Sequence, residues 1–222
     1  MVKNDFVKLF TDAKDVYLFS KQWAKKNYIA LLIILVVYSS LFFADPIIRN
    51  WSLNHHNSIF DFIFNIGHLY GKLHLTFASF VVLYFGGILF RNYRVREWGW
   101  KILEAFIISG IIVTAVKSIL GRWRPYTGHG NFAFYFFTFG PNDHLSLPSG
   151  DVAVAFAFST IVAGFFDNKI WKIFWFGMAV ITALGRIYHD QHWLTDVILA
   201  SVISIFVGNV VNNNSRFKPG LK

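Results

Sequence analysis

Residues 148–166 read PSGDVAVAFAFSTIVAGFF, a short polar turn followed at once by an apolar run. A Pro-Ser-Gly turn before such a run is typical of the start of a helix. From Val152 to Phe166 the run contains no charged residue, and its length nearly suffices to cross the hydrocarbon core of a bilayer. The stretch therefore predicts a membrane helix with polar residues at its start.

Five other segments have the same apolar character, and together they predict an all-α integral membrane bundle of about six transmembrane helices. The six expected spans are Tyr28–Ala44, His74–Phe90, Gly99–Leu120, Val152–Phe166, Ile173–Tyr188 and Thr195–Val211. Several are shorter than the roughly 20 residues of an ideal span, so tilt or flanking aromatic residues must complete them. No internal repeat or linker divides the chain, which predicts a single domain over residues 1–222.

The composition excludes an ordinary soluble domain, because hydrophobic residues make up 55% of the 222 residues and charged residues only 15%. The chain has no cysteine, so neither a disulfide framework nor a thiolate metal site is expected. Residues 1–27 are basic, with apolar residues at helical spacing. This pattern favours an amphipathic segment on the cytoplasmic leaflet, and a solvated helix without a membrane role fits it equally well.

Basic residues predict the orientation of the bundle. In a six-span arrangement, one side collects the lysines and arginines of residues 3–26, 91–101, 169–172 and 216–222. By the positive-inside rule this side is cytoplasmic and carries both termini. The net charge of +9 is then largely a topology signal, and we expect no nucleic-acid partner. We expect a bacterial inner membrane, with polar motifs facing the periplasm or exterior.

Two basic residues stand where the third expected span ends. Lys117 lies inside the end of the span, and Arg124 follows in the next loop, directly before Pro125. An ionisable group at such a depth is costly unless it faces the bundle interior or meets an anion. A lysine that snorkels to the interface would also explain Lys117. Its spacing to Arg124 favours a site where at least two cations converge, with Arg122 close by.

Ser149 and Gly150 stand at the expected start of the fourth span. Helix N-termini offer unpaired N–H groups and the positive end of the helix dipole, and a small Ser-Gly pair lets phosphate oxygens come close to the backbone. Ordinary helix capping by Ser149 explains the same residues. The motif alone leaves both interpretations open.

Arg186, His192 and Asp196 lie across the junction of the last two expected spans. If the last helix begins near Gln191, His192 and Asp196 are one turn apart on a single face. The carboxylate can then set the tautomer of the imidazole, and such a histidine can act as a nucleophile. A structural histidine beside an interfacial Trp193 is the alternative.

The three clusters fall on the same side of the predicted bundle, so we expect one shared site for a phosphate ester or anhydride. A metal site is the competing interpretation, with ligands drawn from His189, Asp190, His192, Asp196 and either His129 or His144. Three cationic side chains at the same mouth would repel a bare divalent ion. We therefore expect no metal and no cofactor.

Three motifs carry a family resemblance: KSILGRWRP (residues 117–125), PSG (148–150) and RIYHDQHWLTD (186–196). In this order and spacing they resemble the signature of the type-2 phosphatidic acid phosphatase superfamily, which includes lipid phosphate phosphatases, bacterial acid phosphatases and vanadium haloperoxidases. The resemblance implies a metal-independent, two-step phosphoryl transfer in which His192 attacks phosphorus to give a phosphohistidine and Asp196 orients it. It also implies that the phosphate oxygens are held by Lys117, Arg124, Ser149, the Gly150 amide and Arg186.

Position 151 departs from that resemblance. The family's second motif normally ends in a histidine that protonates the leaving group, and here Asp151 stands in its place. Asp151 itself could be the acid of an active phosphatase, or His189 or His144 could serve. A diphosphate substrate would need little help, because phosphate leaves more readily than an alkoxide. A form that binds without turnover is the remaining alternative.

The substrate class is predicted from the loop between the third and fourth expected spans. Residues 132–139 are rich in phenylalanine and tyrosine, a pattern typical of headgroup depth that favours a lipid entry path, although simple anchoring explains it as well. We expect a lipid phosphate or diphosphate such as undecaprenyl diphosphate, phosphatidylglycerol phosphate, phosphatidate or a lipid A phosphate. A non-catalytic binder or transporter using His55 and His56, or a phosphotransferase, is the alternative.

Overall fold

The computed structural model describes residues 25–213, which form helices joined by loops. In chain order the helices are α2 (Lys25–Ser40), η2 (Leu41–Phe43), α3 (Asp45–Leu53), α4 (Ser58–Tyr70), α5 (Leu73–Leu89), α6 (Tyr93–Leu120), η3 (Pro125–Thr127), η4 (Asn142–His144), α7 (Gly150–Ala163), α8 (Lys169–Tyr188) and α9 (Leu194–Asn213). The described residues contain no β-strand, which confirms the all-α prediction for this part of the chain. The amphipathic segment expected over residues 1–27 lies outside the described residues, except for the three residues that begin α2.

Helices cover all six expected spans, although their lengths differ. Within residues 25–213, α6, α8 and α9 are long and apolar enough to cross a membrane, and two bent pairs raise the number of candidates to five. The bent pairs are α2 with α3 and α4 with α5, which meet at 40° and 48°. The fourth expected span is α7, which has only 14 residues. The count of six and the cytoplasmic position of the termini stay predictions.

Helix α4 was not expected from the sequence. Its sequence, SIFDFIFNIGHLY, alternates apolar residues with polar ones, so it contains no continuous apolar run of the kind that marks a membrane span. Asn57 caps the helix, because its side-chain oxygen accepts hydrogen bonds from the backbone N–H groups of Ile59 and Phe60. The bend between α4 and α5 places His68 and Lys72 near the three motifs.

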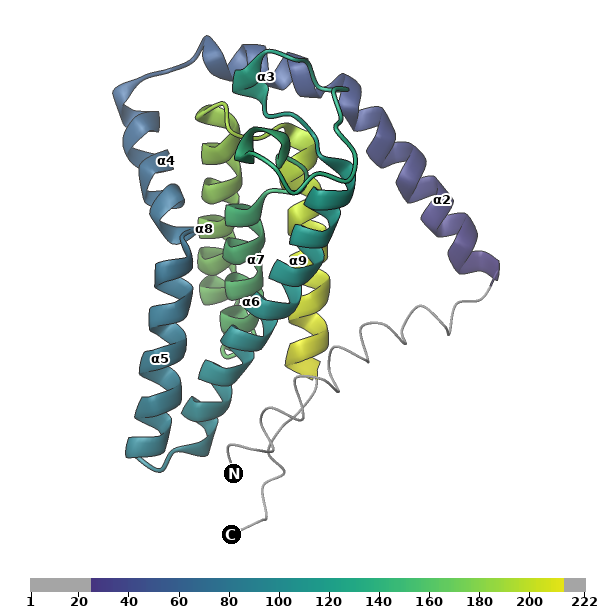
Figure 1. The fold of residues 1–222 in the computed structure, drawn as a ribbon. Coiled ribbons are helices and arrows are strands. Elements are labelled where there is room, and N and C mark those ends of the chain that lie inside the picture. Colours follow the sequence, from purple (N-terminus) through teal and green to yellow (C-terminus); the bar gives the residue numbers. More distant parts are fainter. Residues whose placement is uncertain (1–24, 214–222) are drawn as a thin grey trace.

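The core lies around α7, which α6, α8 and α9 surround in Figure 1. Most side chains of α7 are buried, and Val152, Ala155 and Ile161 have no exposed surface. Alanines at four positions of this helix let its neighbours pack closely. By contrast, α2 leans away from the bundle and exposes most of its apolar side chains.

Close packing joins α4 to α8 at Gly67. A Cβ added at Gly67 would lie 2.8 Å from the backbone carbon of Ile181, so only glycine fits there. At the same level the hydroxyl of Thr182 donates a 2.7 Å hydrogen bond to the Gly67 carbonyl. This contact fixes the C-terminal end of α4, which carries His68, against α8.

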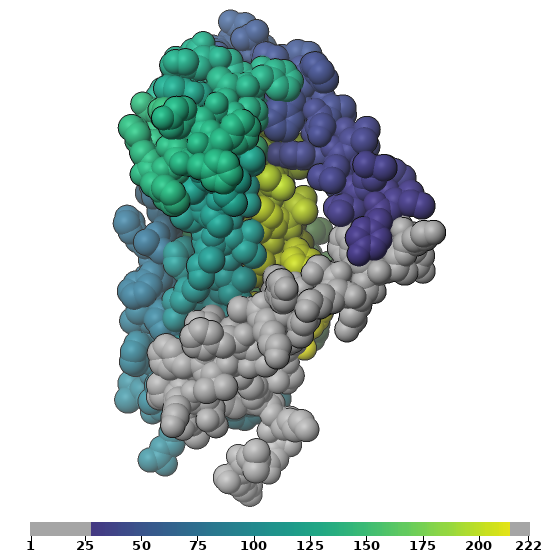
Figure 2. Space-filling view, turned by 45° about the vertical axis from the view of Figure 1, so that its right-hand side comes forward, coloured from purple at the N-terminus to yellow at the C-terminus, as the bar shows by residue number. Residues whose placement is uncertain are grey.

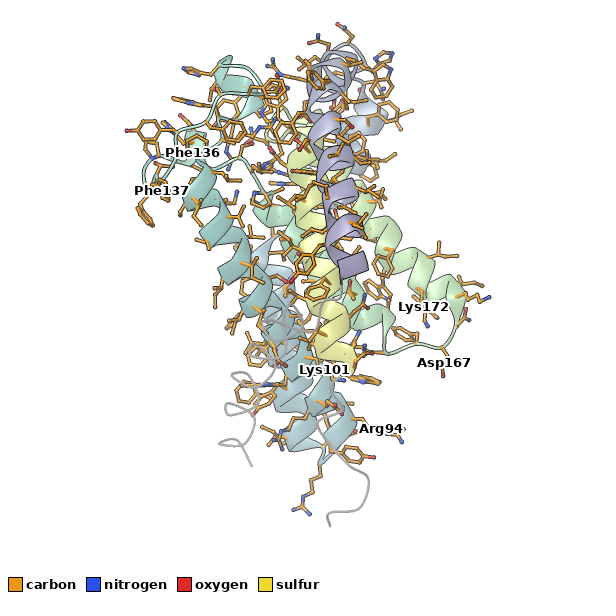
Figure 3. All side chains as sticks on the ribbon, turned by 90° about the vertical axis from the view of Figure 1, so that its right-hand side faces the viewer. Arg94, Lys101, Phe136, Phe137, Asp167 and Lys172 are labelled. Atoms are coloured by element: carbon orange, nitrogen blue, oxygen red, sulfur yellow. The ribbon has the colours of Figure 1, made fainter. Side chains whose placement is uncertain are left out.

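The two ends of the bundle differ. Figure 3 shows Arg94, Lys101 and Lys172 in the half of the molecule away from Phe136 and Phe137. These three basic residues belong to the segments 91–101 and 169–172, which the charge pattern assigns to one side of the bundle. In Figure 2 the residues around 120–150, in green, form a continuous cap at the aromatic end.

The cap begins at Gly121, which ends α6 with a positive φ of 57°. A Cβ at this position would clash with the carbonyl of Tyr135, so both the backbone angle and the packing require glycine. The turn sends the chain from Lys117 at the end of α6 directly into the loop that carries Arg124. The first motif, residues 117–125, therefore turns back at Gly121 across the end of the bundle that carries the cap.

Candidate active site

The three motifs meet in one cavity of about 670 Å³ at the aromatic end of the bundle. Its lining residues are Asn65, His68, Lys72, Lys117, Arg124, Asn142, Gly150, Asp151, Arg186, His189, Gln191 and His192. Four of these side chains are cationic and only Asp151 is a carboxylate. The cavity is therefore suited to an anion.

His192 lines the cavity from the loop between α8 and α9. Its Nδ1 lies 2.9 Å from the carbonyl oxygen of Ser146 and 3.5 Å from Oδ2 of Asp196. The carbonyl can only accept, so Nδ1 carries the proton and Nε2 is the ring nitrogen with a free lone pair. Burial lowers the pKa of His192 to about 3, although the hydrogen bond that the ring donates to the Asp196 carboxylate opposes this shift. The ring is thus neutral near pH 7.

The structure corrects two expectations around His192. The last helix begins at Leu194 rather than near Gln191, so His192 precedes α9 instead of lying on it. The i,i+4 contact with Asp196 survives, but the carbonyl of Ser146 is the nearer partner of the ring. Orientation of the imidazole is therefore shared between a backbone carbonyl and a carboxylate.

Asp196 is held in place by Arg122 rather than by the histidine alone. Nη1 of Arg122 lies 2.6 Å from Oδ1 of Asp196, and Nη2 lies 2.6 Å from Oδ2 of Asp45. The Asp196 carboxylate also accepts hydrogen bonds from the Ser146 hydroxyl and the Trp193 backbone N–H. Arg122, which was expected close by, does not line the cavity: its guanidinium is buried, where it balances two carboxylates.

Lys117 and Arg124 approach the cavity from the first motif. Nζ of Lys117 donates a short hydrogen bond to the carbonyl of Leu145. The guanidinium of Arg124 donates to the backbone and side-chain oxygens of Asn142, at 2.9 and 2.8 Å, and to those of Gln191, at 3.3 Å. Neither side chain is paired with a carboxylate in these contacts, so both are available to an incoming anion. The convergence expected for these two residues is confirmed.

The start of α7 contributes Ser149 and Gly150. Ser149 occupies the N-cap position, but its side chain makes no capping hydrogen bond, so the ordinary capping interpretation is wrong. Its hydroxyl is fully buried and has no hydrogen-bond partner among residues 25–213. Gly150 leaves open space, since an added Cβ would meet only Cε of Lys117, at 4.0 Å. An unpaired hydroxyl beside an open helix N-terminus is a suitable place for a phosphate oxygen.

Arg186, Asp151 and His68 form a triangle on another wall of the cavity. Nη1 of Arg186 lies 3.0 Å from Nδ1 of His68 and 3.4 Å from Oδ2 of Asp151. The same carboxylate oxygen lies 3.8 Å from Nδ1 of His68. Nε of Arg186 is buried without a partner among the described residues. Asp151, which replaces the expected histidine, thus faces a histidine supplied by α4.

Other candidate residues are not brought into the cavity. His129 and His144 stack on Trp123, and Asp190 pairs with Arg49 at 2.6 Å. Within residues 25–213 no three His, Asp or Glu side chains are placed to hold a metal ion, so the alternative ligand set is not assembled. His55 and His56, named for a headgroup binder, lie on Trp51 and Tyr188 and do not line the cavity.

The sequence reasoning missed His68, Lys72, Asn65, Asn142 and Ser146. Asn65 and His68 are three residues apart on α4, so they share a face, and that spacing could have marked α4 as a helix that lines a polar site. Lys72 sits in the short α4–α5 junction. Ser146 contributes mainly its backbone carbonyl, for which a sequence carries no signal.

An apolar groove leads to the site along α6. Its volume is about 700 Å³, and it is lined by Phe106, Ile107, Gly110, Ile111, Thr114, Ala115, Ser118, Ile119 and Phe139. A smaller cavity of about 220 Å³ between α6 and α7 shares Phe106, Gly110 and Thr114 with this groove. The same cavity shares Lys117 and Gly150 with the catalytic cavity. The groove, the smaller cavity and the cavity with the cations are therefore neighbours along α6, separated by side chains that they share.

Comparison with known proteins gives consistent matches. A family model described as "PAP2 superfamily" matches residues 98–218, more than half of the chain. A lipid A 1-phosphatase from Porphyromonas gingivalis is 26% identical over 122 residues, which are 53% of this chain and 24% of that protein. The chain thus matches about a quarter of the length of this relative.

Two solved structures share the fold. The crystal structure of Aquifex aeolicus LpxE has a TM-score of 0.60 and 21% identity, and the match covers 77% of this chain and 95% of that one. A transmembrane PAP2-type phosphatidylglycerolphosphate phosphatase from Bacillus subtilis has a TM-score of 0.66 and 20% identity, covering 88% and 100%. At these identities the likeness is one of fold.

Proposed function

Because the chain belongs to the PAP2 superfamily, we propose that it is a membrane-embedded phosphatase that hydrolyses a lipid phosphate or diphosphate through a phosphohistidine on His192. One observation carries the proposal: a buried, neutral imidazole with its Nδ1 proton committed to Ser146 lines a cavity that holds four cationic side chains. A nucleophile next to a phosphate site is what a two-step phosphoryl transfer needs.

In the first step, Nε2 of His192 attacks phosphorus, the P–N bond forms and the bond to the leaving oxygen breaks. The imidazole becomes cationic as it does so, and Asp196 and the Ser146 carbonyl stabilise the proton on Nδ1. Water then attacks the phosphohistidine and releases inorganic phosphate. Neither step requires a metal, and the family resemblance likewise implies metal-independent chemistry.

The phosphate oxygens are held by Lys117, Arg124 and Arg186, with the Ser149 hydroxyl and the Gly150 amide at the start of α7. The unpaired Ser149 hydroxyl and the unpaired Nε of Arg186 support these roles, since buried polar groups normally have partners. Such fixed donors stabilise the charge that spreads over the phosphoryl oxygens in the transition state.

A lipid is the substrate that suits the surroundings of the cavity. The apolar groove along α6 is next to a smaller cavity that shares Lys117 and Gly150 with the proposed active site, which supports a hydrocarbon chain lying along α6 while its phosphate meets the cations. The P. gingivalis relative and the B. subtilis structure are both described as phosphatases of lipid phosphates. We place the site on the extracytoplasmic face of a bacterial inner membrane, with both termini in the cytoplasm.

The test measures phosphate release by the purified protein in detergent, with EDTA present, from a polyprenyl diphosphate and from phosphatidate. His192→Ala is the matched variant. Release that survives EDTA and is lost in the variant supports the histidine mechanism, and a radiolabelled acid-labile phosphoenzyme identifies the intermediate. Release of phosphate only when a second lipid acceptor is present would indicate a phosphotransferase. Binding of both lipids without any turnover would indicate a binder or transporter.

A further inference from the structure

An alkyl phosphate needs a proton source when its P–O bond breaks, because an alkoxide is a poor leaving group. Asp151 stands where the resemblance leads one to expect that source. The Asp151 carboxylate, however, already faces Arg186 at 3.4 Å and His68 at 3.8 Å, which is the position of a proton acceptor between two basic groups. The proton has to come from another group that lines the cavity.

His68 is the histidine that meets the requirements of geometry. It lines the cavity together with His192, and it comes from α4, a helix outside the three motifs. Its Nδ1 lies 3.0 Å from Nη1 of Arg186, which can only donate. In the ligand-free arrangement Nδ1 is therefore the acceptor, and Nε2 carries the hydrogen.

We propose that His68 is the general acid that protonates the leaving oxygen, and that Asp151 is the positioning residue that holds the protonated His68. The inference rests on the proposed phosphatase function and deepens it. In this arrangement His68 on α4 donates the proton and Asp151 on α7 orients it, whereas the family resemblance implies a single second-motif histidine.

The proposed sequence of events starts with phosphate binding. The anion draws the guanidinium of Arg186 toward its oxygens, which releases Nδ1 of His68 to take up a proton and donate it in a hydrogen bond to Asp151. As Nε2 of His192 bonds to phosphorus and the P–O bond breaks, the leaving oxygen receives the proton from Nε2 of His68. In the second step Nε2 of His68 accepts a proton from the attacking water, which regenerates the protonated imidazole. When phosphate leaves and Arg186 returns to His68, Nδ1 releases its extra proton to solvent and the ligand-free state is restored.

The packing of α4 supports this role. Gly67, directly before His68, contacts the backbone of Ile181 on α8 and accepts a hydrogen bond from Thr182. His68 is therefore held in a fixed position on α4, the helix that packs directly against α8, which carries Arg186. His189 is the competing histidine in the lining of the cavity, but among the described residues it is His68 that lies 3.8 Å from the Asp151 carboxylate.

The test uses the purified full-length protein and two substrates of matched chain length, an alkyl phosphate and a nitrophenyl phosphate that carries the alkyl chain. Nitrophenolate is a good leaving group and leaves without being protonated, whereas the alkoxide must be protonated as it leaves. We expect His68→Gln to lower kcat on the alkyl phosphate roughly 10²–10⁴-fold and to change the nitrophenyl rate by less than about threefold. The control is His55→Gln, an exposed histidine outside the cavity, which should change neither rate.

Asp151→Asn gives an independent readout. The groups that face His68 are Asp151 from α7, Arg186 and His189 from the end of α8, and Lys72 after α4. Asp151 is the only one of these four that favours a protonated His68. In Asp151→Asn the rate on the alkyl phosphate should therefore decline at lower pH than in the parent protein, with the nitrophenyl rate little changed.

Equal loss on both substrates in a folded His68→Gln protein, or no loss on either, would overturn the proposal. Parent protein that releases phosphate from neither substrate would instead overturn the proposed function. If the variants do not fold, the parent protein alone gives a test. The ratio of the alkyl phosphate rate to the nitrophenyl phosphate rate, measured from about pH 5 to about 9, must fall as the general acid loses its proton. A ratio that stays constant over this interval rejects a general acid.

Discussion

Arg122 and Asp196 form an ion pair of 2.6 Å in which neither side chain is exposed. The same guanidinium contacts Asp45 on α3 at 2.6 Å, so it joins the N-terminal half of the chain to the start of α9. Because Asp196 also contacts His192, the pair connects the packing of the bundle to the position of the proposed nucleophile.

Arg122→Met is expected to lower the free energy of unfolding by about 3–5 kcal/mol, because it leaves two buried carboxylates without their counter-charge. Tryptophan fluorescence during denaturant unfolding in detergent measures the change. Arg49→Met is the control: its pair with Asp190 is partly exposed, with side-chain exposures of 27% and 18%, and should contribute about 1 kcal/mol or less. Equal effects of the two substitutions would contradict the assigned role of Arg122.

Ser149→Ala is expected to lower kcat/KM for a lipid phosphate roughly 10- to 150-fold, the value of a hydrogen bond to a charged group of about 1.5–3 kcal/mol. The unfolding midpoint should not fall, because the Ser149 hydroxyl makes no hydrogen bond among the described residues that could be lost. Steady-state kinetics and thermal unfolding measure the two effects. A lower midpoint with unchanged kinetics would return Ser149 to a structural role.

Gly150→Ala should weaken phosphate binding without weakening the fold. An alanine Cβ would approach only Lys117 within the protein, yet it would project into the space proposed for the phosphate. Alanine also favours helix over glycine by up to about 1 kcal/mol. Inhibition by inorganic phosphate measures binding. Gly177→Ala on α8, where an added Cβ has no neighbour within 4 Å, should leave that inhibition unchanged.

The pH dependence of activity should reflect the depressed pKa of His192. Burial lowers this pKa from 6.5 to about 3, so the nucleophile stays neutral through mildly acidic conditions. The rate on the nitrophenyl substrate should therefore hold below pH 6.5. A fall in this rate centred near pH 6.5 would contradict the prediction. If the fall persisted when other titratable residues were substituted, it would show that His192 titrates like an exposed histidine.

The same shift predicts how the stability of the fold changes with pH. Between pH 6.5 and about 3 the unfolded chain binds a proton at His192 that the folded protein does not bind. The folded state thus loses stability as the pH falls through this interval. His192→Gln should lose less stability over the same interval, which denaturant unfolding at several pH values can measure.

Asp151→His should reduce activity on an alkyl phosphate. The substitution removes the one carboxylate that lines the cavity and puts a third imidazole near His68 and Arg186. Loss of activity would mean that the site is built around the carboxylate. A large gain in turnover would mean instead that a histidine at 151 donates the proton better than the existing arrangement.

Several expectations from the sequence are confirmed because they depend on local chemistry. The apolar run after Gly150 forms α7, and α6 ends at Leu120, where the third expected span ends. The spacing of Lys117, Arg124 and Arg186 predicted that cations converge, and all three line one cavity. These features follow from residue type and order along a single segment.

Other features could not be predicted because they depend on contacts between distant segments. The polar residues of α4, of which Asn65 and His68 line the cavity, hide its apolar pattern. Gly67 positions the helix through contacts with α8, more than 100 residues away. The role of Arg122 depends on its partners Asp45 and Asp196, which lie 77 and 74 residues away and which the first motif does not reveal.

The amino-acid sequence by itself determined the apolar character, the helical class and the cluster of cationic residues of this protein, because hydrophobicity, helix starts and fixed charges are properties of short segments. Only the tertiary structure decided which charges face the substrate and which balance one another in the interior. It also brought His68 to Asp151, since the packing of α4 on α8 and α7 is set by shape complementarity across the whole bundle.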